Sequence, residues 1–362
     1  VLLNDTSDGG SAQTFKGMLA YIDSHSPSIV VFENVDTIDD CRGDDVASNL
    51  DILLAEMGNR GFEAQTIMTD ASTLGCPARR RRVYVVFLKV AGNRLVDFGS
   101  RSITSMFATL RAVMCSCIRS PCCGTEIPLP ADDPAVAADL ELREVKRQKR
   151  DQAAQKAGPT PQTWMDSHMA FARQLKFRWG QQVPASLRSN PCFQTLTKRE
   201  QDVLRLAQVQ SPKLLFRDLS QSVQRANIQS EDAESGLHVF PTVLPKMLLW
   251  LEGQERVWLG REALMCQGFP VLPLLSEHEA VKRPQAWSPT EALMQDLAGN
   301  AMALPVLMAI LQSMFAAFSW EGTRDDAAPS PRRAVNSKDK NDIDQALSAI
   351  QQVSDLAAAS EA

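Results

Sequence analysis

The sequence lacks any apolar run of about 18 residues, the length that a membrane-spanning helix needs, so we expect no membrane partner. It also lacks a basic excess, because 38 lysines and arginines stand against 43 aspartates and glutamates and the net charge is −5. Nucleic-acid binders usually carry a basic excess or a basic face, so any such contact here must be local. The eight cysteines mostly lack regular spacing, which favours a reducing intracellular compartment over a disulfide framework.

What the chain does have is enough apolar material for a core. Its 362 residues are 44% hydrophobic, which predicts one sizeable core and a second, smaller one. Phe15, Met18, Leu19 and Ile22 recur at helical spacing and predict a helix over residues 12–24. A second amphipathic helix is predicted from Val46, Leu50, Leu53, Leu54 and Met57.

A short apolar run, SIVVF at residues 28–32, ends abruptly in Glu33 and Asn34. An unbroken apolar run is typical of a strand that is covered on both faces of a parallel sheet. The carboxyl ends of such strands form the crevice in which ligands bind in open α/β sheets. The pattern therefore places a carboxyl group at a functional edge.

Two further strands are predicted at residues 62–68 and 83–88, joined by the loop TDASTLGCPARRRR. If they pair as a hairpin, the second strand runs antiparallel and begins near the edge where Glu33 emerges. Strand alternation would place Arg80 and Arg82 on one face and Arg79 and Arg81 on the other.

Four segments in order carry a family resemblance: FENVDTI, GCPARRRRVYVV, WLGREALMCQGFP and LAGNAMALPVLMAI. They resemble conserved blocks of the C5-cytosine DNA methyltransferases, over about residues 12–90 and 255–318. Ala78 stands where the family has glutamine. The resemblance implies an α/β fold, a Rossmann-like S-adenosylmethionine-dependent methyltransferase mixed sheet with an inserted target recognition domain.

The resemblance also implies roles for particular residues. Glu33 would be the acid at the cytosine N3 edge, because thiolate attack on C6 builds negative charge that a proton must neutralise. Asn34 and Val35 would shape the active-site loop. Arg80 and Arg82 would brace the base's carbonyl oxygen, the catalytic carboxylate or the nearby DNA phosphates. The base would be flipped out of double-stranded DNA, with RNA as a possible substrate.

The remaining implied sites concern the donor and the DNA. S-adenosyl-L-methionine is the implied cofactor, and no metal is expected. The donor pocket would be lined by Gly299, Asn300, Ala301 and Met302. DNA contacts are implied for Arg79, Arg81 and Arg261. A blander interpretation makes Glu33 a loop residue, the arginines a solvated basic loop, and the Asn300 block a helix N-terminus.

The family's Gly-rich donor loop and its Pro-Cys-Gln nucleophile are not found before Glu33. The sequence begins with Val1 rather than Met, so we expect an N-terminally incomplete chain with both blocks upstream. The alternative is a catalytically inactive homologue that binds DNA or a protein. Pro121-Cys122 and Pro191-Cys192 superficially match the nucleophile block, but they lie in the wrong order relative to Glu33.

The predicted domain boundaries follow the resemblance. Residues 1–90 and 258–320 would form the methyltransferase core, 91–257 the target recognition domain, and 321–362 a disordered tail with an amphipathic helix over residues 343–356. The basic run ELREVKRQKRDQ reads as a solvated helix, because acidic residues are interleaved. The four thiols of CSCIRSPCC lack the paired spacing that zinc prefers.

One segment competes with the methyltransferase interpretation. TLTKREQDVLRLAQ, residues 195–208, resembles the start of the helix-turn-helix domain of response regulators, which would make the protein a transcriptional regulator. The residues that follow do not repeat that pattern, so we expect a structural helix capped by Thr197 and Glu200. The expected location is intracellular, and nuclear if the source is eukaryotic, which the long tail and large insert favour.

Overall fold

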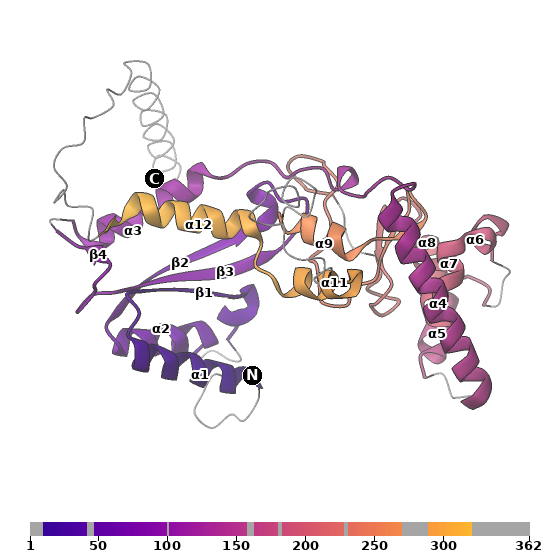
Figure 1. Ribbon diagram of the computed structural model, residues 1–362, viewed down its shortest axis with the longest axis horizontal. Coiled ribbons are helices and arrows are strands. Elements are labelled where there is room, and N and C mark those ends of the chain that lie inside the picture. The colour runs from indigo at the N-terminus through magenta and orange to yellow at the C-terminus, as the bar shows by residue number, and fades with distance from the viewer. Residues whose placement is uncertain are drawn as a thin grey trace, which may run out of the picture. The chain divides into compact units, whose positions relative to one another are not determined.

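The computed structural model describes residues 10–41, 47–99, 101–157, 163–179, 183–227, 231–269 and 289–320 (Figure 1). The chain is mixed α/β and divides into two compact units. Unit 1 comprises residues 1–70, 81–119 and 306–362, and unit 2 comprises residues 71–80 and 120–305. Each unit is therefore built from stretches that are separated in the sequence.

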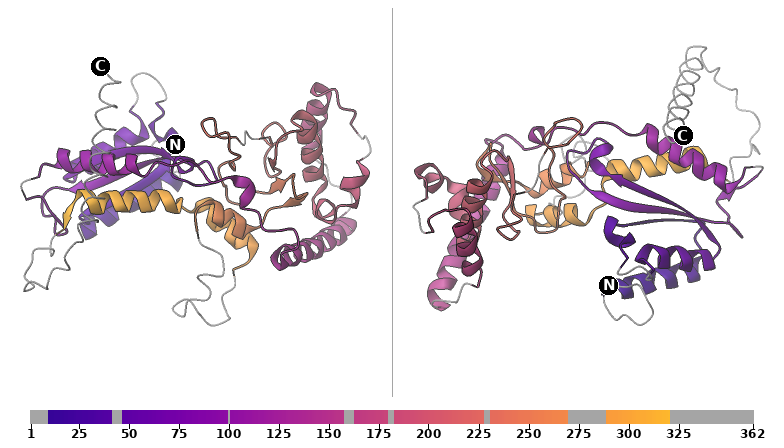
Figure 2. Two further views of the ribbon diagram at one scale, coloured as in Figure 1. Left: turned by 90° about the horizontal axis from the view of Figure 1, so that it is seen from above. Right: turned by 180° about the vertical axis from the view of Figure 1, so that it is seen from behind.

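Unit 1 is a three-stranded sheet between two layers of helices. Figure 1 and the view from behind in Figure 2 show α1 and α2 on one face of the sheet and α3 and α12 on the other. Its elements are α1 (Gly10–His25), β1 (Ile29–Val35), the 3-10 helix Asp36–Asp39, α2 (Asn49–Asn59), β2 (Phe62–Asp70), β3 (Arg81–Lys89), β4 (Val96–Asp97), α3 (Ile103–Ser116), α12 (Leu304–Ala317) and β8 (Ser319–Trp320).

The order of the sheet is β1-β3-β2, and β3 is antiparallel to both neighbours. The predicted hairpin of β2 with β3 is confirmed. The prediction that residues 28–32 form a fully covered strand of a parallel sheet is wrong, because β1 is half-buried and pairs antiparallel with β3. The central strand is β3, in which residues 83–88 are at most 1% exposed.

The two predicted N-terminal helices are confirmed as α1 and α2. Phe15 and Ile22 of α1 and Leu53 and Met57 of α2 are buried in one cluster with β3. Helical spacing put these side chains on one face of each helix, and the sheet covers that face. Val46 lies outside the described residues.

Unit 2 combines helices with a small antiparallel sheet of order β5-β6-β7. Its core surrounds the buried aromatic rings of Trp250, Trp258 and Phe240. Its elements are the 3-10 helices Ala71–Thr73 and Gly124–Glu126, α4 (Pro134–Ala157), α5 (Met165–Gln174), α6 (Ala185–Ser189), α7 (Pro191–Thr195), α8 (Lys198–Gln210), β5 (Phe216–Asp218), β6 (Leu249–Leu251), β7 (Arg256–Val257), α9 (Gly260–Cys266) and α11 (Glu291–Asn300).

Helix α8 is the predicted capped helix. The Thr197 side chain accepts the Glu200 N–H, and the Glu200 carboxylate accepts the Thr197 N–H, which is the reciprocal capping box. Val203, Leu204 and Leu206 are buried. Residues 211–227, which follow α8, contain the short strand β5 and no helix, so the described segment lacks the second helix that a helix-turn-helix reader requires.

The boundaries of the two compact units differ from the predicted domain boundaries. Residues 71–80 belong to unit 2 because Ala78 forms a bridge with Phe240, whose carbonyl accepts the Arg79 N–H at 3.0 Å. Unit 2 also includes residues 258–305, whereas residues 91–119 belong to unit 1. A target recognition role for residues 91–257 stays a prediction, and the tail at 321–362 lies outside the described residues.

The described helices can be compared with the length and apolar content that a membrane span needs. No single one is long and apolar enough to cross a membrane, and Glu291–Asn300 with Leu304–Ala317 reach that length and composition only when joined.

His168 gives unit 2 a pH-dependent stability. It is 2% exposed on α5, between the rings of Trp164 and Trp179, and burial lowers its pKa below the ordinary 6.5, with Arg199 adding to the effect. As the pH falls, His168 is protonated more readily in the unfolded chain than in the folded chain. The stability that comes from neutral His168 is therefore present above pH 6.5 and is lost as the pH falls below it.

We expect the His168→Phe variant to lose less stability than the unchanged chain as the pH falls from 7 to 5. The free energy of unfolding that depends on His168 changes by at most about 1.4 kcal/mol per pH unit, because one proton is bound. Thermal unfolding between pH 7 and pH 5 measures it. His25→Gln, which changes an exposed histidine, is the matched control. If the His168→Phe variant lost as much stability between pH 7 and pH 5 as the unchanged chain, the assignment of this pH dependence to His168 would be contradicted.

Candidate functional site

The carboxylate of Glu33 and the guanidinium of Arg82 meet at one end of the unit 1 sheet. Glu33 is opposite Tyr84 in the β1–β3 register, so Arg82, two residues before Tyr84, is its diagonal neighbour on the same face. Arg82 Nε lies 3.1 Å from Glu33 Oε1, and the two side chains are 13% and 17% exposed. A largely desolvated carboxylate therefore lies beside a guanidinium group. The start of β3 lies near Glu33, as the sequence predicted for the strand at residues 83–88.

Asn34 and Val35 shape the chain as it leaves the sheet. The Asn34 Oδ1 accepts the Val35 N–H at 2.8 Å, and the 3-10 helix Asp36–Asp39 follows at once. Ile38 is buried in the core of unit 1 and anchors this turn. Glu33 is thus held between a strand and an anchored turn, which limits its movement.

The four consecutive arginines do not share one strand. Strand β3 begins at Arg81, so the predicted alternation applies only to Arg81 and Arg82. Arg81 is 61% exposed and pairs loosely with Asp36, Nε to Oδ2 at 3.6 Å. The side chain of Arg79 donates to the Glu231 carbonyl within unit 2.

Arg80 is buried in unit 2 rather than exposed in a basic loop. It is 5% exposed, and its Nη1 lies 3.4 Å from the carbonyl oxygens of Val243 and Gly299. These contacts join the loop before β3 to the end of α11. They give Arg80 a structural task that the sequence pattern did not indicate.

The 299–302 block closes α11 and begins the turn toward α12. A Cβ on Gly299 would lie 2.0 Å from the Pro245 nitrogen, so only glycine allows this close approach of α11 to the chain at 244–245. Asn300 is exposed, and its Nδ2 donates to the Asp296 carbonyl at 2.9 Å. It ends α11, so the interpretation of this block as a helix N-terminus is wrong.

The methyl donor of the resembled family can be tested against this block. Gly299 does not fit as a cradle, because protein backbone already occupies the space next to its Cα. Asn300 fits better, because its exposed amide can meet a polar group of a ligand. Ala301 and Met302 follow the helix end and are half-buried.

Arg261, predicted to contact DNA, is held by Glu291. The Arg261 Nε donates to Glu291 Oε1 at 2.7 Å, and the Arg261 N–H donates to Oε2 at 3.0 Å. The Arg261 side chain is 39% exposed, and no described residue accepts a hydrogen bond from its other two guanidinium nitrogens. The pair fixes the start of α9 against the start of α11.

Neither downstream cysteine that superficially matches the nucleophile block is built as a nucleophile. Cys192 is buried, burial raises its thiol pKa, and its sulfur accepts the Val257 N–H at 3.4 Å. Cys122 is exposed, and no described side chain forms a hydrogen bond with its thiol. In the described part of the chain, no group of three or more His, Cys, Asp or Glu side chains could hold a metal ion.

The sequence model of the C-5 cytosine-specific DNA methylases matches residues 4–316. The chain belongs to this family. A curated member, the DNA (cytosine-5-)-methyltransferase DMT5 of Cryptococcus neoformans var. grubii, is 25% identical over 331 residues, which cover 83% of this chain. The chain spans only 12% of the length of that relative.

Two solved structures also resemble this member of the methylase family. The S. pombe Dnmt2 methyltransferase is 17% identical, with 86% of this chain and 72% of that chain covered and a TM-score of 0.34. A putative DNA modification methyltransferase encoded within an E. coli prophage is 13% identical, with 85% and 75% covered and a TM-score of 0.38. Both TM-scores are low, so the assignment rests on the sequence match.

Proposed function

We propose that this methylase-family chain contributes the acid side of a DNA (cytosine-5-)-methyltransferase, which transfers a methyl group from S-adenosylmethionine to C5 of a flipped cytosine. The observation that carries the proposal is the Glu33–Arg82 pair at the end of the sheet, at 3.1 Å and with both side chains mostly desolvated. Family membership supplies the reaction class.

The mechanism assigned to Glu33 is proton donation or sharing at cytosine N3. Attack of a thiolate on C6 places negative charge on the ring, and a carboxyl group at the N3 edge neutralises that charge by donating or sharing its proton. Arg82 holds the carboxyl group in place through the ion pair between its Nε and Glu33 Oε1. The base must leave the helix, because its N3 edge is paired in duplex DNA.

The donor supplies the methyl group when bound, and Asn300 is the residue of the 299–302 block that we assign to its polar end. Among the three arginines predicted to contact DNA, Arg81 is the most accessible, since its side chain is 61% exposed although its guanidinium contacts Asp36 and the Met68 sulfur. Arg79 and Arg261 are already engaged by Glu231 and Glu291. We therefore assign the main phosphate contact to Arg81.

We further propose that residues 91–257 contain the target recognition function and that the protein acts inside the cell, in the nucleus if its source is eukaryotic. Unit 2 supports the first of these assignments as a separately folded body with its own core.

Methyl transfer by the natural full-length protein tests the function. Tritiated S-adenosylmethionine is supplied with a duplex that contains unmodified cytosines, and the label is expected at C5 of the DNA. A duplex with 5-methylcytosine at every cytosine is the matched control and should stay unlabelled. Labelling of a tRNA substrate alone would make the chain an RNA methyltransferase, and DNA binding without transfer would make it an inactive binding homologue.

A further inference from the structure

Helix α12 presents an apolar outer face that the described residues leave largely uncovered. Its 14 residues include no charged side chain. The inner face, which contains Ile310, is buried in unit 1. On the outer face Met308 is 56% exposed and Phe315 is 63% exposed, and Leu304 and Leu311 are half-buried. A helix that is apolar all round is normally buried, so this face indicates a missing partner.

The outer residues recur at the spacing of a seam between two helices. Leu304, Met308, Leu311 and Phe315, which we call the α12 stripe, are separated by four, three and four residues. This is the spacing of the a and d positions of a heptad. The stripe runs for about 16 Å along the helix. A second helix whose apolar residues follow the same spacing would fit it.

The α12 stripe ends beside the last described residue, Trp320. The Phe315 and Trp320 rings have centroids 5.1 Å apart, and Trp320 Nε1 donates to the Phe315 carbonyl at 3.4 Å. The residues that follow Trp320 in the sequence therefore begin next to the stripe.

One segment beyond Trp320 has the required pattern in its sequence. Ile343, Leu347 and Ile350 are separated by four and three residues and predict one apolar face of a helix over residues 343–356. This segment lies outside the described residues. A helix of that length is marginal in water by itself, so it gains stability when its apolar face is covered. About 22 residues separate it from Trp320, and a coil of that length spans about 25 Å on average, which exceeds the length of the stripe.

The charges next to the α12 stripe are positive. Helix α3 lies beside α12 on the same face of the unit 1 sheet (Figures 1 and 2). Residues 98–119, which contain α3, carry three arginines and no acidic residue. Arg111, in the middle of α3, is exposed and forms no ion pair with a described residue. Residues 341–362 carry four acidic residues and no basic one, so their charge is complementary to that of α3.

We propose that residues 343–356 dock as a helix on the α12 stripe of the same chain, with their apolar face packed against Met308, Leu311 and Phe315. The acidic residues of this segment then lie near Arg111 of α3. Because the contact forms within one chain, the effective concentration of the segment is in the millimolar range, which a separate partner would have to exceed. The contact does not depend on the proposed methyl transfer.

Photo-cross-linking in the natural full-length protein tests the proposal. p-Benzoylphenylalanine in place of Phe315 is expected to cross-link to residues 343–356 of the same chain, as identified by mass spectrometry of the peptides. Leu347→Asp with Ile350→Asp should lower the yield of this cross-link by about tenfold or more, because each substitution places a charge in an apolar contact. Ser348→Asp with Gln352→Asp adds the same charge on the polar face of the predicted helix, and this matched control should cross-link as the unchanged chain does.

A second probe position controls for unspecific capture. Tyr21 is 59% exposed on α1, which covers the other face of the sheet, so the same probe in its place should not capture residues 343–356. Cross-links from the Phe315 position to a second copy of the chain would make that copy the occupant of the stripe. Cross-links to any other stretch of the full-length protein would likewise overturn the proposal.

Amide hydrogen exchange gives an independent measurement. Exchange over residues 343–356 should be slower by about tenfold or more in the unchanged protein than in a Met308→Asp, Phe315→Asp variant, because docking protects the amides of the helix. Both replaced side chains are exposed, so the core of unit 1 should stay intact. Equal exchange in the two proteins would show that residues 343–356 do not dock on the stripe.

Discussion

Glu33→Gln should lower the rate of methyl transfer by at least about 100-fold while DNA binding stays within a factor of about two, because general acid catalysis contributes 10²–10⁴-fold. The substitution keeps the size of the side chain and removes its ability to donate a proton at N3. Single-turnover transfer by the full-length protein measures the loss, and a duplex-binding assay measures the retained affinity. Unchanged transfer would remove Glu33 from the role of the acid.

The structure offers a matched control for this experiment. Glu63 is an exposed carboxylate on β2, and its register partner Leu88 lies at the end of β3 far from Arg82. Glu63→Gln changes the same functional group on the same sheet, and we expect unaltered transfer. Glu33→Gln also removes the negative charge that pairs with Arg82. Thermal unfolding of both variants therefore shows whether reduced transfer comes from loss of the acid or from destabilisation of the sheet.

Glu262→Leu should destabilise unit 2 by about 3–5 kcal/mol, because it leaves a buried arginine without its partner. Arg256 and Glu262 are 5% and 1% exposed and form a two-point pair, at 2.6 and 3.0 Å. Glu262 also accepts the N–H groups of Leu259 and Leu129, and Arg256 donates to the Leu129 carbonyl. One ion pair therefore joins the chain at Leu129 to the stretch that runs from β7 into α9.

The unfolding midpoint of Glu262→Leu is expected to fall by roughly 10 °C. Adding Arg256→Met to this variant should restore much of the loss, because apolar replacements of both partners leave no buried charge. Glu144→Gln is the control, since Glu144 pairs with Arg147 at 2.6 Å on the exposed face of α4, where water screens the interaction. A small loss in Glu262→Leu would show that Arg256 can reach water.

The parts of the fold that the sequence predicted are those in which local pattern and tertiary packing agree. Helices α1, α2 and α8 follow from apolar spacing and capping residues, and β2 and β3 from runs of β-forming residues. The placement of Arg82 near Glu33 followed from the hairpin, because an antiparallel strand must start where its neighbour ends. Family blocks supplied the reaction class that these patterns alone could not.

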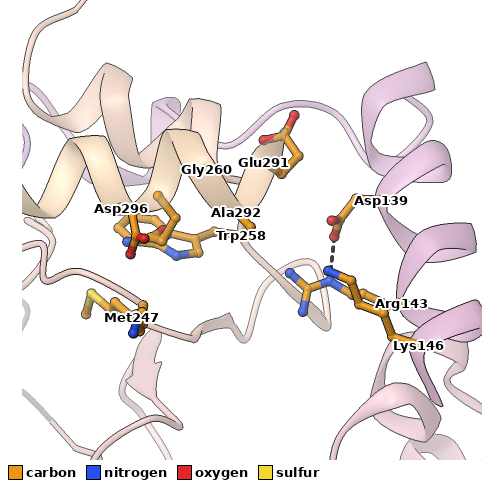
Figure 3. A pocket seen from close by; sticks show the side chains of 11 residues that line it. Asp139, Arg143, Lys146, Met247, Trp258, Gly260, Glu291, Ala292 and Asp296 are labelled. Atoms are coloured by element: carbon orange, nitrogen blue, oxygen red, sulfur yellow. Dashed lines mark hydrogen bonds and ion pairs between the residues drawn. The ribbon is translucent and has the colours of Figure 1, made fainter. Parts of the chain in front are cut away.

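The misjudged features depend on contacts that are distant in sequence. SIVVF is as apolar as a central strand, yet β3 takes the centre and β1 lies half-buried beside it. Arg80 looks like one more exposed arginine, but carbonyls more than 160 residues away surround it. A cavity of about 350 Å³ in unit 2 could not be predicted either, because its walls come from α4, residues 246–247, residues 258–260 and α11 (Figure 3).

The order in which the stretches of unit 1 occur along the chain has a consequence for synthesis on the ribosome. Strand β4 pairs with β8, and Phe107 contacts Phe318, so unit 1 is closed by residues that follow all of unit 2 in the sequence. Domains generally fold as units while the chain emerges. The β1-β3-β2 sheet is synthesised early, and one of its faces lacks α12 until about 200 further residues have been translated. During that interval the nascent protein exposes an apolar surface that a chaperone would recognise, and a premature stop before α12 would leave it exposed permanently.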